Sequence, residues 1–309
     1  MNSKEPTLAP IVIFAYHRAE LFQNLLCSLQ QNELAEHSEL FIYIDGATDS
    51  NDEIKVSKVR GVANTVSGFK SVDMRISQTH KGLAKSVVSG ITEISQNYDR
   101  IIVLEDDLVV SRFFLKYMNA MLQKHEQDKS IMQISGFGGA IPNSNKYNGE
   151  YYLCGRAQSW GWATWSDRWT TIDWNVSDYE TFMQNEKVVL GFSNLGSDLI
   201  TSLQEYVRGD RDVWLIAYIY NMYRKKGFCI CPIHSLVKNE GFGENASNCK
   251  NYNRYRVDFN NDTFYDVNIS EIPYNATIER KSLRFWSIRY RIYGKVMTIL
   301  QSFFLCGKK

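Results

Sequence analysis

The sequence predicts an α/β fold in which a mostly parallel sheet is flanked by helices. Apolar β-type runs alternate with helical periodicity throughout residues 1–110, as βαβ units require. The consecutive apolar residues at 100–104 are typical of a strand that is buried on both faces of a parallel sheet. The chain is also long enough, at 309 residues with 44% hydrophobic content, to bury a sizeable core.

Each expected element follows from its local pattern. In the first half, apolar β-forming runs predict strands at 10–16, 40–44, 72–76 and 100–104. Apolar residues at helical spacing predict helices at 21–29 and 83–94, and a third connecting helix is expected at 52–66. In the second half we expect helices at 112–127, 197–207 and 213–226 and strands at 131–134, 151–154 and 228–230.

Polar side chains follow each strand of the first half at the point where the strand ends. Arg18, Asp45 and His80 come after the first three strands, and Lys85 follows His80 in the same segment. Open α/β sheets bind ligands at the carboxyl ends of their strands. We therefore predict a nucleotide pocket at this edge, with these four residues as substrate-binding candidates.

The fourth strand runs into three adjacent carboxylates, Glu105, Asp106 and Asp107. Adjacent carboxylates repel one another, so their burial needs a compensating cation. A hard divalent ion such as Mn²⁺ or Mg²⁺, bridging to phosphate oxygens, would supply it. The alternative is a solvated acidic turn without a ligand.

Residues 156–169 contain four tryptophans. Trp162, Trp165 and Trp169 recur at helical spacing, which favours a role in the core. Trp160 stands beside Gly161, and a flat indole next to glycine is a plausible surface for stacking a sugar. Core packing is the alternative for Trp160 as well.

Asp212 stands in a short link before the helix expected at 213–226. A carboxylate there is either a helix N-cap or a residue placed for chemistry. Further on, residues 239–245 contain two glycines, which suggests a loop with glycine hinges.

Composition bounds the partners and the compartment. The net charge of +1 argues against a nucleic-acid binder that relies on a basic field. No cysteine belongs to a Cys-x-x-Cys pair, and reduced thiols in the cytoplasm are the expectation. Residues 1–10 do not resemble a signal peptide, and no run of ~18 uncharged apolar residues predicts a transmembrane helix.

The character of the chain changes from Arg280 onward. Basic residues alternate with aromatic and aliphatic ones up to Lys295, and residues 296–306 are nearly all apolar. This pattern predicts an amphipathic segment that lies on an anionic membrane surface. The alternative is a docked C-terminal helix with a solvated basic face.

Four motifs can be read together: residues 10–18 (PIVIFAYHR), 45–46 (DG), 103–108 (VLEDDL) and 160–162 (WGW). In them the sequence resembles GT-A-fold glycosyltransferases, in particular the N-acetylglucosaminyltransferase I family and its bacterial relatives. The resemblance covers roughly residues 10–243 and implies a Rossmann-like, mostly parallel sheet.

The resemblance also implies roles for individual residues. Arg18 and Asp45 would contact the nucleotide, Glu105 would reach the donor sugar and Asp107 would bind manganese. Asp212, followed by one residue and a tryptophan, matches the catalytic base of that family. The family has a tryptophan directly before this aspartate, where the present chain has Arg211. Asp106 completes the set of substrate-binding candidates.

The prediction is an inverting, metal-dependent hexosyl- or N-acetylhexosaminyltransferase that uses a nucleoside-diphosphate sugar, with UDP as the expected nucleotide. Its acceptor would be a glycan or lipid-linked glycan of a bacterial surface polysaccharide, such as O-antigen or capsule. The expected location is cytoplasmic, at the periphery of the inner membrane.

The expected divisions are a nucleotide-sugar half at 1–110, an acceptor and catalytic half at 111–250, and a C-terminal extension at 251–309. Two alternatives remain. A sugar nucleotidyltransferase needs a glycine-rich basic loop after the first strand, which residues 16–18 lack. The other is a non-catalytic carbohydrate-binding or scaffold protein on the same fold.

Overall fold

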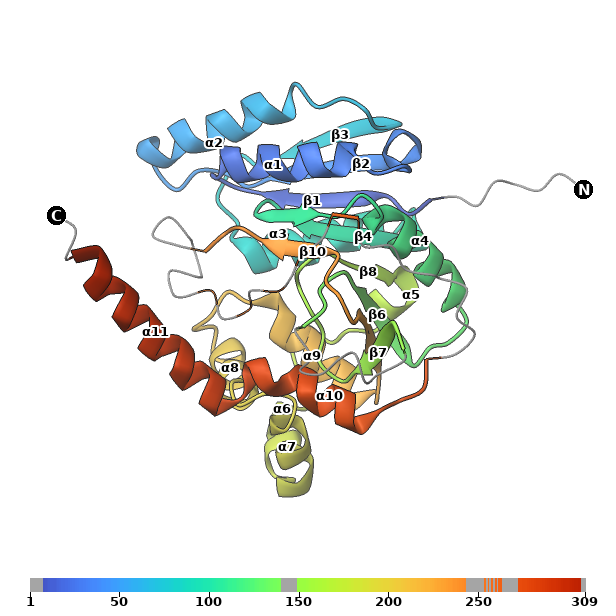
Figure 1. The fold of residues 1–309 in the computed structure, drawn as a ribbon, viewed down its shortest axis with the longest axis vertical. Helices are drawn as coiled ribbons and strands as arrows, with labels where there is room; N and C mark the ends of the chain where they lie inside the picture. Colours follow the sequence, from blue (N-terminus) through green and yellow to red (C-terminus); the bar gives the residue numbers. More distant parts are fainter. Residues whose placement is uncertain are drawn as a thin grey trace, which may run out of the picture.

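The structure is a computed structural model that describes residues 8–139, 149–242, 253, 255, 257, 259, 261–262 and 272–306. An eight-stranded sheet forms its centre, in the order β3-β2-β1-β4-β8-β6-β9-β7 (Figure 1). The strands pair in parallel except for β8 and β7, which run against their neighbours. The prediction of an α/β fold with a mostly parallel sheet and flanking helices is confirmed.

The first half follows the predicted alternation closely. Its elements are β1 (Ile11–Ala15), α1 (Ala19–Gln30), the short 3-10 helix η1 (Ala35–His37), β2 (Glu39–Ile44), α2 (Ser50–Ala63), β3 (Ser71–Ile76), α3 (Leu83–Ile94) and β4 (Arg100–Glu105). Strand β1 lies between β2 and β4, with Ile13 opposite both Ile42 and Leu104.

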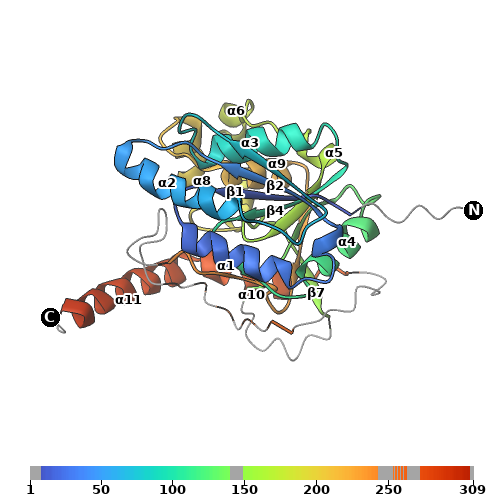
Figure 2. The same cartoon turned by 90° about the horizontal axis from the view of Figure 1, so that it is seen from above.

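Alternate residues of β1 point into two different cores, as the period of two in a strand requires. Ile11 and Ile13 join the core under α1 and α4, whereas Val12 and Phe14 join the core under α3 and α9. The two helical layers lie on opposite sides of the sheet (Figure 2). Burial on both faces explains why β1 and the inner positions of β4 read as continuous apolar runs.

The second half completes the same sheet. Its elements are β5 (Leu108–Val110), α4 (Phe114–Lys124), β6 (Ile131–Ser135), β7 (Tyr151–Cys154), β8 (Trp162–Trp165), α5 (Ser166–Trp169), α6 (Tyr179–Met183), α7 (Glu186–Ser193), α8 (Leu199–Val207), α9 (Trp214–Arg224), β9 (Phe228–Pro232) and β10 (Val237–Asn239). Strand β10 pairs antiparallel with β5 in a separate small sheet. Of the predicted loop at 239–245, residues 243–245 lie outside the described part of the chain.

The helical reading of the tryptophan segment is wrong for Trp162 and Trp165, although its assignment to the core is right; Trp169 does end a short helix, α5. Trp162 and Trp165 are both 1% exposed, but they begin and end the strand β8. Their side chains enter opposite cores, which residues three apart do in a strand and not in a helix. Hydrogen bonding to β4 on one side and β6 on the other decides the conformation.

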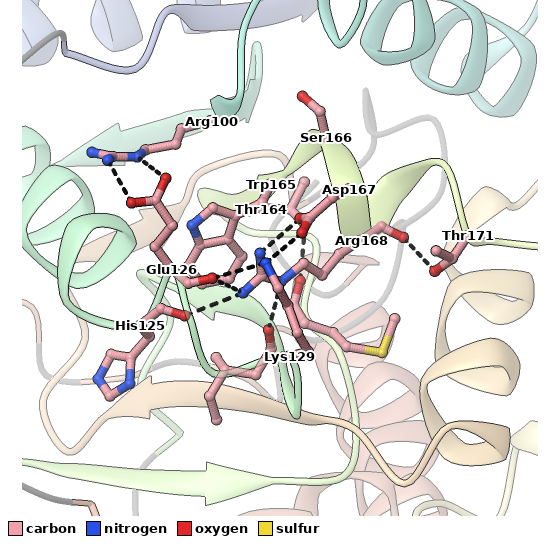
Figure 3. A network of polar contacts seen from close by, with 12 residues as sticks. Arg100, His125, Glu126, Lys129, Thr164, Trp165, Ser166, Asp167, Arg168 and Thr171 are labelled. Atoms are coloured by element: carbon pink, nitrogen blue, oxygen red, sulfur yellow. Dashed lines mark hydrogen bonds and ion pairs between the residues drawn. The ribbon is translucent and has the colours of Figure 1, made fainter.

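A network of charged side chains holds the N-terminal end of β4 in place (Figure 3). The Arg168 guanidinium donates to the carbonyl oxygens of His125 and Glu126, at 3.2 and 2.6 Å, and lies 4.2 Å from the Trp165 ring centroid. Arg100, the first residue of β4, pairs with Glu126 at 3.0 Å. The network therefore supports the sheet at the first residue of β4, whereas Glu105 is the last residue of that strand.

The C-terminal segment consists of a docked part and a projecting part. Helix α10 (Ala276–Ser282) and the 3-10 helix η3 (Leu283–Trp286) pack on the body. Trp286 is 9% exposed, lies 4.6 Å from the Arg156 guanidinium and accepts a hydrogen bond from the Ser197 amide at 3.0 Å. The docked alternative therefore applies to these residues.

Helix α11 (Ile288–Cys306) then leaves the body, as Figure 1 shows. Several of its apolar side chains are exposed, with Ile288 at 63% and Ile292 and Ile299 at 56%. Among the described residues, no helix combines the length and the apolar character needed to cross a membrane.

Candidate functional site

The acidic cluster predicted after β4 is buried and already has a cation. Strands β1 and β4 pair in parallel, with Phe14 opposite Glu105, so the residues that follow the two strands become neighbours. The Arg18 guanidinium donates to Asp107 Oδ2 through Nη1 at 2.8 Å and to Asp106 Oδ1 through Nη2. The solvated acidic turn is thus wrong, because Asp106 and Asp107 are only 2% and 7% exposed.

Every carboxylate oxygen of Asp106 and Asp107 accepts a hydrogen bond. Asp106 Oδ2 accepts from the Tyr16 amide at 3.1 Å, and Asp107 Oδ1 accepts from Asn239 Nδ2 at 3.1 Å. Gly241 passes so close that a Cβ there would clash with the Asp107 carboxylate. Each of the four carboxylate oxygens therefore has a donor from the protein itself.

The electrostatics of the cluster still favour more positive charge. Burial raises the pKa of Glu105 to about 8, and the charges of Asp107 and Asp106 add to the effect. Burial raises the pKa of Asp106 to about 6 against the opposing influence of Arg18. Burial alone would lower the pKa of Arg18, but the two aspartates outweigh it and raise that pKa. One guanidinium does not neutralise three carboxylates.

The described residues can supply only part of the coordination shell of a divalent cation. Within the described ranges, no three His, Cys, Asp or Glu side chains are arranged to hold a metal. Mg²⁺ in particular is commonly held by one or two carboxylates together with phosphate oxygens of a substrate. Asp107 offers hard oxygen ligands and unneutralised negative charge, although Arg18 uses its Oδ2.

Asp45 organises a second group at the same edge of the sheet. Its Oδ1 accepts from the Gly46 and Lys81 amides, both at 2.9 Å. Its Oδ2 accepts from the Gly82 amide at 3.0 Å and lies 3.0 Å from His80 Nδ1. Asp45 thereby joins the end of β2 to the segment that leads from β3 into α3.

Tyr16 connects the two groups and was missed by the sequence reasoning. Its amide binds Asp106, and its ring centroid lies 5.0 Å from that of His80. Contacts are therefore continuous from Asp107 through Arg18, Asp106, Tyr16 and His80 to Asp45. The structure brings together the residues predicted at the ends of β1, β2, β3 and β4.

Asp52, on α2, was also missed. It accepts a hydrogen bond from the Tyr16 hydroxyl and another from the Thr48 amide at 3.0 Å, and His17 Nδ1 lies 3.3 Å from its Oδ1. Burial opposes ionisation of Asp52, but the bonds from Tyr16 and Thr48 outweigh it and lower the pKa. Burial and the bond to Asp52 raise the pKa of Tyr16 to about 12. No local pattern distinguishes Asp52, because an acidic residue in a first helical turn is ordinary.

Asp212 is a helix cap, but not of the predicted helix. Helix α9 has Val213 at its N-cap, with no side-chain hydrogen bond there. Asp212 Oδ1 instead accepts from the Ala84 amide at 3.2 Å, in the first turn of α3. Its Oδ2 lies against Gly82, where an added Cβ would be 2.5 Å away. The Asp212 side chain thus meets the segment that Asp45 holds.

The remaining two predicted residues, Lys85 and Trp160, lie outside the chain of contacts that runs from Asp107 to Asp45. Lys85 is exposed in the first turn of α3. Trp160 is half-buried among Phe137, Phe242 and Tyr255, with ring centroids 4.8, 5.9 and 5.6 Å away and rings nearly perpendicular. These contacts assign much of the Trp160 surface to packing.

Comparison with known proteins identifies no family. No protein-family profile matches the chain, and no curated protein matches it. Among solved structures, one similar chain is a mannosyltransferase from Pyrobaculum calidifontis in complex with GDP-Man and Mn²⁺. It has 15% identity and a TM-score of 0.36, with 52% of this chain and 48% of that chain covered.

Two other solved structures are similar to a comparable degree. TarS from S. aureus in complex with UDP-GlcNAc has 18% identity and a TM-score of 0.30, with coverage of 41% of this chain and 33% of that chain. A putative glucose-1-phosphate thymidylyltransferase from Bacillus anthracis has 11% identity and a TM-score of 0.40, with coverage of 75% and 89%. The match spans about half of the mannosyltransferase and a third of TarS. At these identities and TM-scores, the likenesses establish neither a family nor an activity.

Proposed function

We propose that the protein is a glycosyltransferase that moves a sugar from a nucleoside-diphosphate sugar, with UDP as the expected nucleotide, to a hydroxyl of a glycan or lipid-linked glycan. The observation that carries the proposal is the continuous polar group from Asp107 to Asp45 at the carboxyl ends of β1, β2, β3 and β4. It combines a guanidinium, which suits phosphate, with carboxylates that suit a cation and sugar hydroxyls. The GT-A resemblance of the sequence supports the same assignment.

The donor would be held by the residues of the first half. Arg18, Asp45, His80 and Lys85 would bind the nucleotide, and Glu105 and Asp106 would contact the sugar. Asp107 would hold Mn²⁺ or Mg²⁺ together with the diphosphate. When bound, the metal would neutralise negative charge on the departing diphosphate.

The acceptor would be activated by the second half. As the acceptor oxygen bonds to the anomeric carbon and the bond to the diphosphate breaks, the Asp212 carboxylate would take the hydroxyl proton. One candidate base, with no candidate nucleophile among the residues assigned to the site, would make the transfer a single displacement and therefore inverting, as the family resemblance also implies. We assign residues 1–110 to the donor and 111–250 to the acceptor, with Trp160 as a candidate contact to the acceptor.

The C-terminal extension, residues 251–309, would place the enzyme at the inner face of a bacterial membrane. The exposed apolar side chains of α11 recur along the helix at Ile288, Ile292, Val296 and Ile299, with Leu300 beside them. Spacings of three and four residues put them on one face. Arg289 and Lys295 are also exposed and can meet anionic lipid headgroups. A lipid-linked acceptor for surface polysaccharide would then be within reach.

A panel of UDP-, GDP- and dTDP-sugars tests the function. We expect one of them to raise the melting temperature and to release its nucleoside diphosphate slowly in the presence of Mn²⁺. Stabilisation without release by any donor or acceptor would indicate a non-catalytic binder. Pyrophosphate release from a nucleoside triphosphate and a sugar phosphate would indicate a nucleotidyltransferase instead.

A further inference from the structure

We propose that Arg18 is the resident counter-ion of the acidic cluster, and that a divalent cation binds Asp107 well only when a diphosphate draws Arg18 away. The proposal rests on the proposed function, since it takes the donor diphosphate as the group that receives Arg18. It predicts that metal and nucleotide assist each other's binding through one side chain.

On the inner side of the cluster, both oxygens of Asp107 already accept hydrogen bonds from the protein. Arg18 spans both aspartates, and its side chain is 18% exposed while that of Asp107 is 9% exposed. Asn239 uses the other oxygen of Asp107. A metal bound to Asp107 Oδ2 would share that oxygen with Arg18 Nη1, so the two cations compete for it.

The charges explain why a metal does not readily replace Arg18 at Asp107 when no nucleotide is bound. A dication that approaches Asp107 while Arg18 stays in place meets a guanidinium within a few ångströms in a buried environment, where charges interact strongly. Moving Arg18 away without a new partner leaves its charge unpaired, which is costly for a group that is mostly buried.

A diphosphate removes both obstacles. Its oxygens match the two-pronged guanidinium and bind it with charge-assisted hydrogen bonds. The same oxygens can complete the shell of a metal on Asp107. Binding of either ligand then improves binding of the other by the same factor, as thermodynamic linkage requires.

The first experiment titrates Mn²⁺ alone into the full chain and follows free Mn²⁺ by electron paramagnetic resonance. We expect Arg18→Gln to bind Mn²⁺ about tenfold more tightly than the wild type, because the competing cation is gone. Arg18→Lys keeps the charge and should stay near the wild type. Arg60→Gln, which removes a surface arginine paired with Glu53, is the matched control and should change nothing.

The second experiment measures UDP and GDP affinity by calorimetry with and without Mn²⁺. The factor by which Mn²⁺ increases nucleotide affinity should be about tenfold larger in the wild type than in Arg18→Gln. Complex formation between Mn²⁺ and nucleotide in solution is common to both proteins and cancels in the comparison. Equal increases in the two proteins would overturn the coupling.

Two further results decide the case if the variants are unstable. If Arg18→Gln unfolds easily, its melting temperature should rise with added Mn²⁺ far more than that of the wild type. Adding Asp107→Asn to Arg18→Gln should abolish the gained Mn²⁺ affinity. A gain that survives this second change, or equal Mn²⁺ affinity in wild type and Arg18→Gln, contradicts the proposal. Failure to transfer any sugar beside the expected binding results would overturn the proposed function and not the role of Arg18.

Discussion

Replacing Asp212 by asparagine separates its two possible roles. The carboxylate caps α3 through the Ala84 amide at 3.2 Å, and asparagine can accept the same hydrogen bond. We therefore expect the free energy of unfolding to change by no more than about 0.5 kcal/mol. Alanine cannot cap and should cost about 1 kcal/mol, or roughly 2 °C in melting temperature for a chain of this size.

Turnover should respond very differently from stability. Asparagine cannot accept a proton from the acceptor hydroxyl, so the rate should fall roughly 10²–10⁴-fold, equivalent to about 3–5 kcal/mol in activation free energy. Donor affinity should barely change, because Arg18 and Asp45, which are assigned to bind the nucleotide, are unaltered in this variant. The assay is acceptor-dependent release of nucleoside diphosphate, measured beside donor binding and thermal melting.

Asp210→Asn is the matched control, since Asp210 is an exposed neighbour that lies 3.5 Å from Arg208 Nε. It should turn over normally. Normal turnover in Asp212→Asn, with loss in Asp210→Asn, would show that the wrong carboxylate was assigned. Equal loss of stability and activity in Asp212→Asn would leave capping as the whole role of Asp212.

Three other predictions follow from the structure. Deleting residues 288–309 removes α11 but keeps the docked Trp286. The deletion should shift the protein from the membrane fraction to the soluble fraction and spare activity on a soluble acceptor. Each basic residue removed should weaken the free energy of membrane binding by about 1 kcal/mol. Unchanged partitioning would contradict membrane attachment. Asp107→Ala should abolish metal-dependent donor binding, and it should also lower the melting temperature because Arg18 and Asn239 lose their acceptor. Normal turnover without metal would refute its role. Glu105 has a pKa raised from 4.5 to about 8, so its protonated form stabilises the fold below about pH 4.5 and that stability is lost as the pH rises through 8. Melting of Glu105→Gln should therefore depend less on pH than that of the wild type between about pH 5 and 8, and identical profiles would disprove the assignment.

The strands of the first half could be predicted because their signal is local. Burial on both faces demands apolar residues at every position of β1 and at the four inner positions of β4, and that demand is visible as two short runs in the sequence. The polar residues at their ends could be placed at one edge because parallel strands end together. Tryptophans at 162, 165 and 169 misled the same reasoning, since their spacing fits a helix while sheet pairing fixes a strand at 162–165.

The contacts of the site could not be predicted because they are not local. The sequence suggested that buried carboxylates need a cation, but nothing near Asp107 indicated that Arg18, 89 positions away, supplies it. Asp212 looked like the cap of the helix that follows it, yet it reaches an amide 128 positions earlier. Tyr16 and Asp52 carry no motif, and only the fold makes them partners.

The segment around Gly82 is where the two halves of the proposed site meet. Asp45 holds the Gly82 amide from one side, and Asp212 lies against the Gly82 Cα from the other. Gly82 has φ of +83°, and any side chain there would both strain the backbone and push on Asp212. The residue assigned to the nucleotide and the residue assigned as base therefore share one support. Their separation is set by a hydrogen-bonded turn at the start of α3, so a change at this turn should disturb donor binding and proton transfer together.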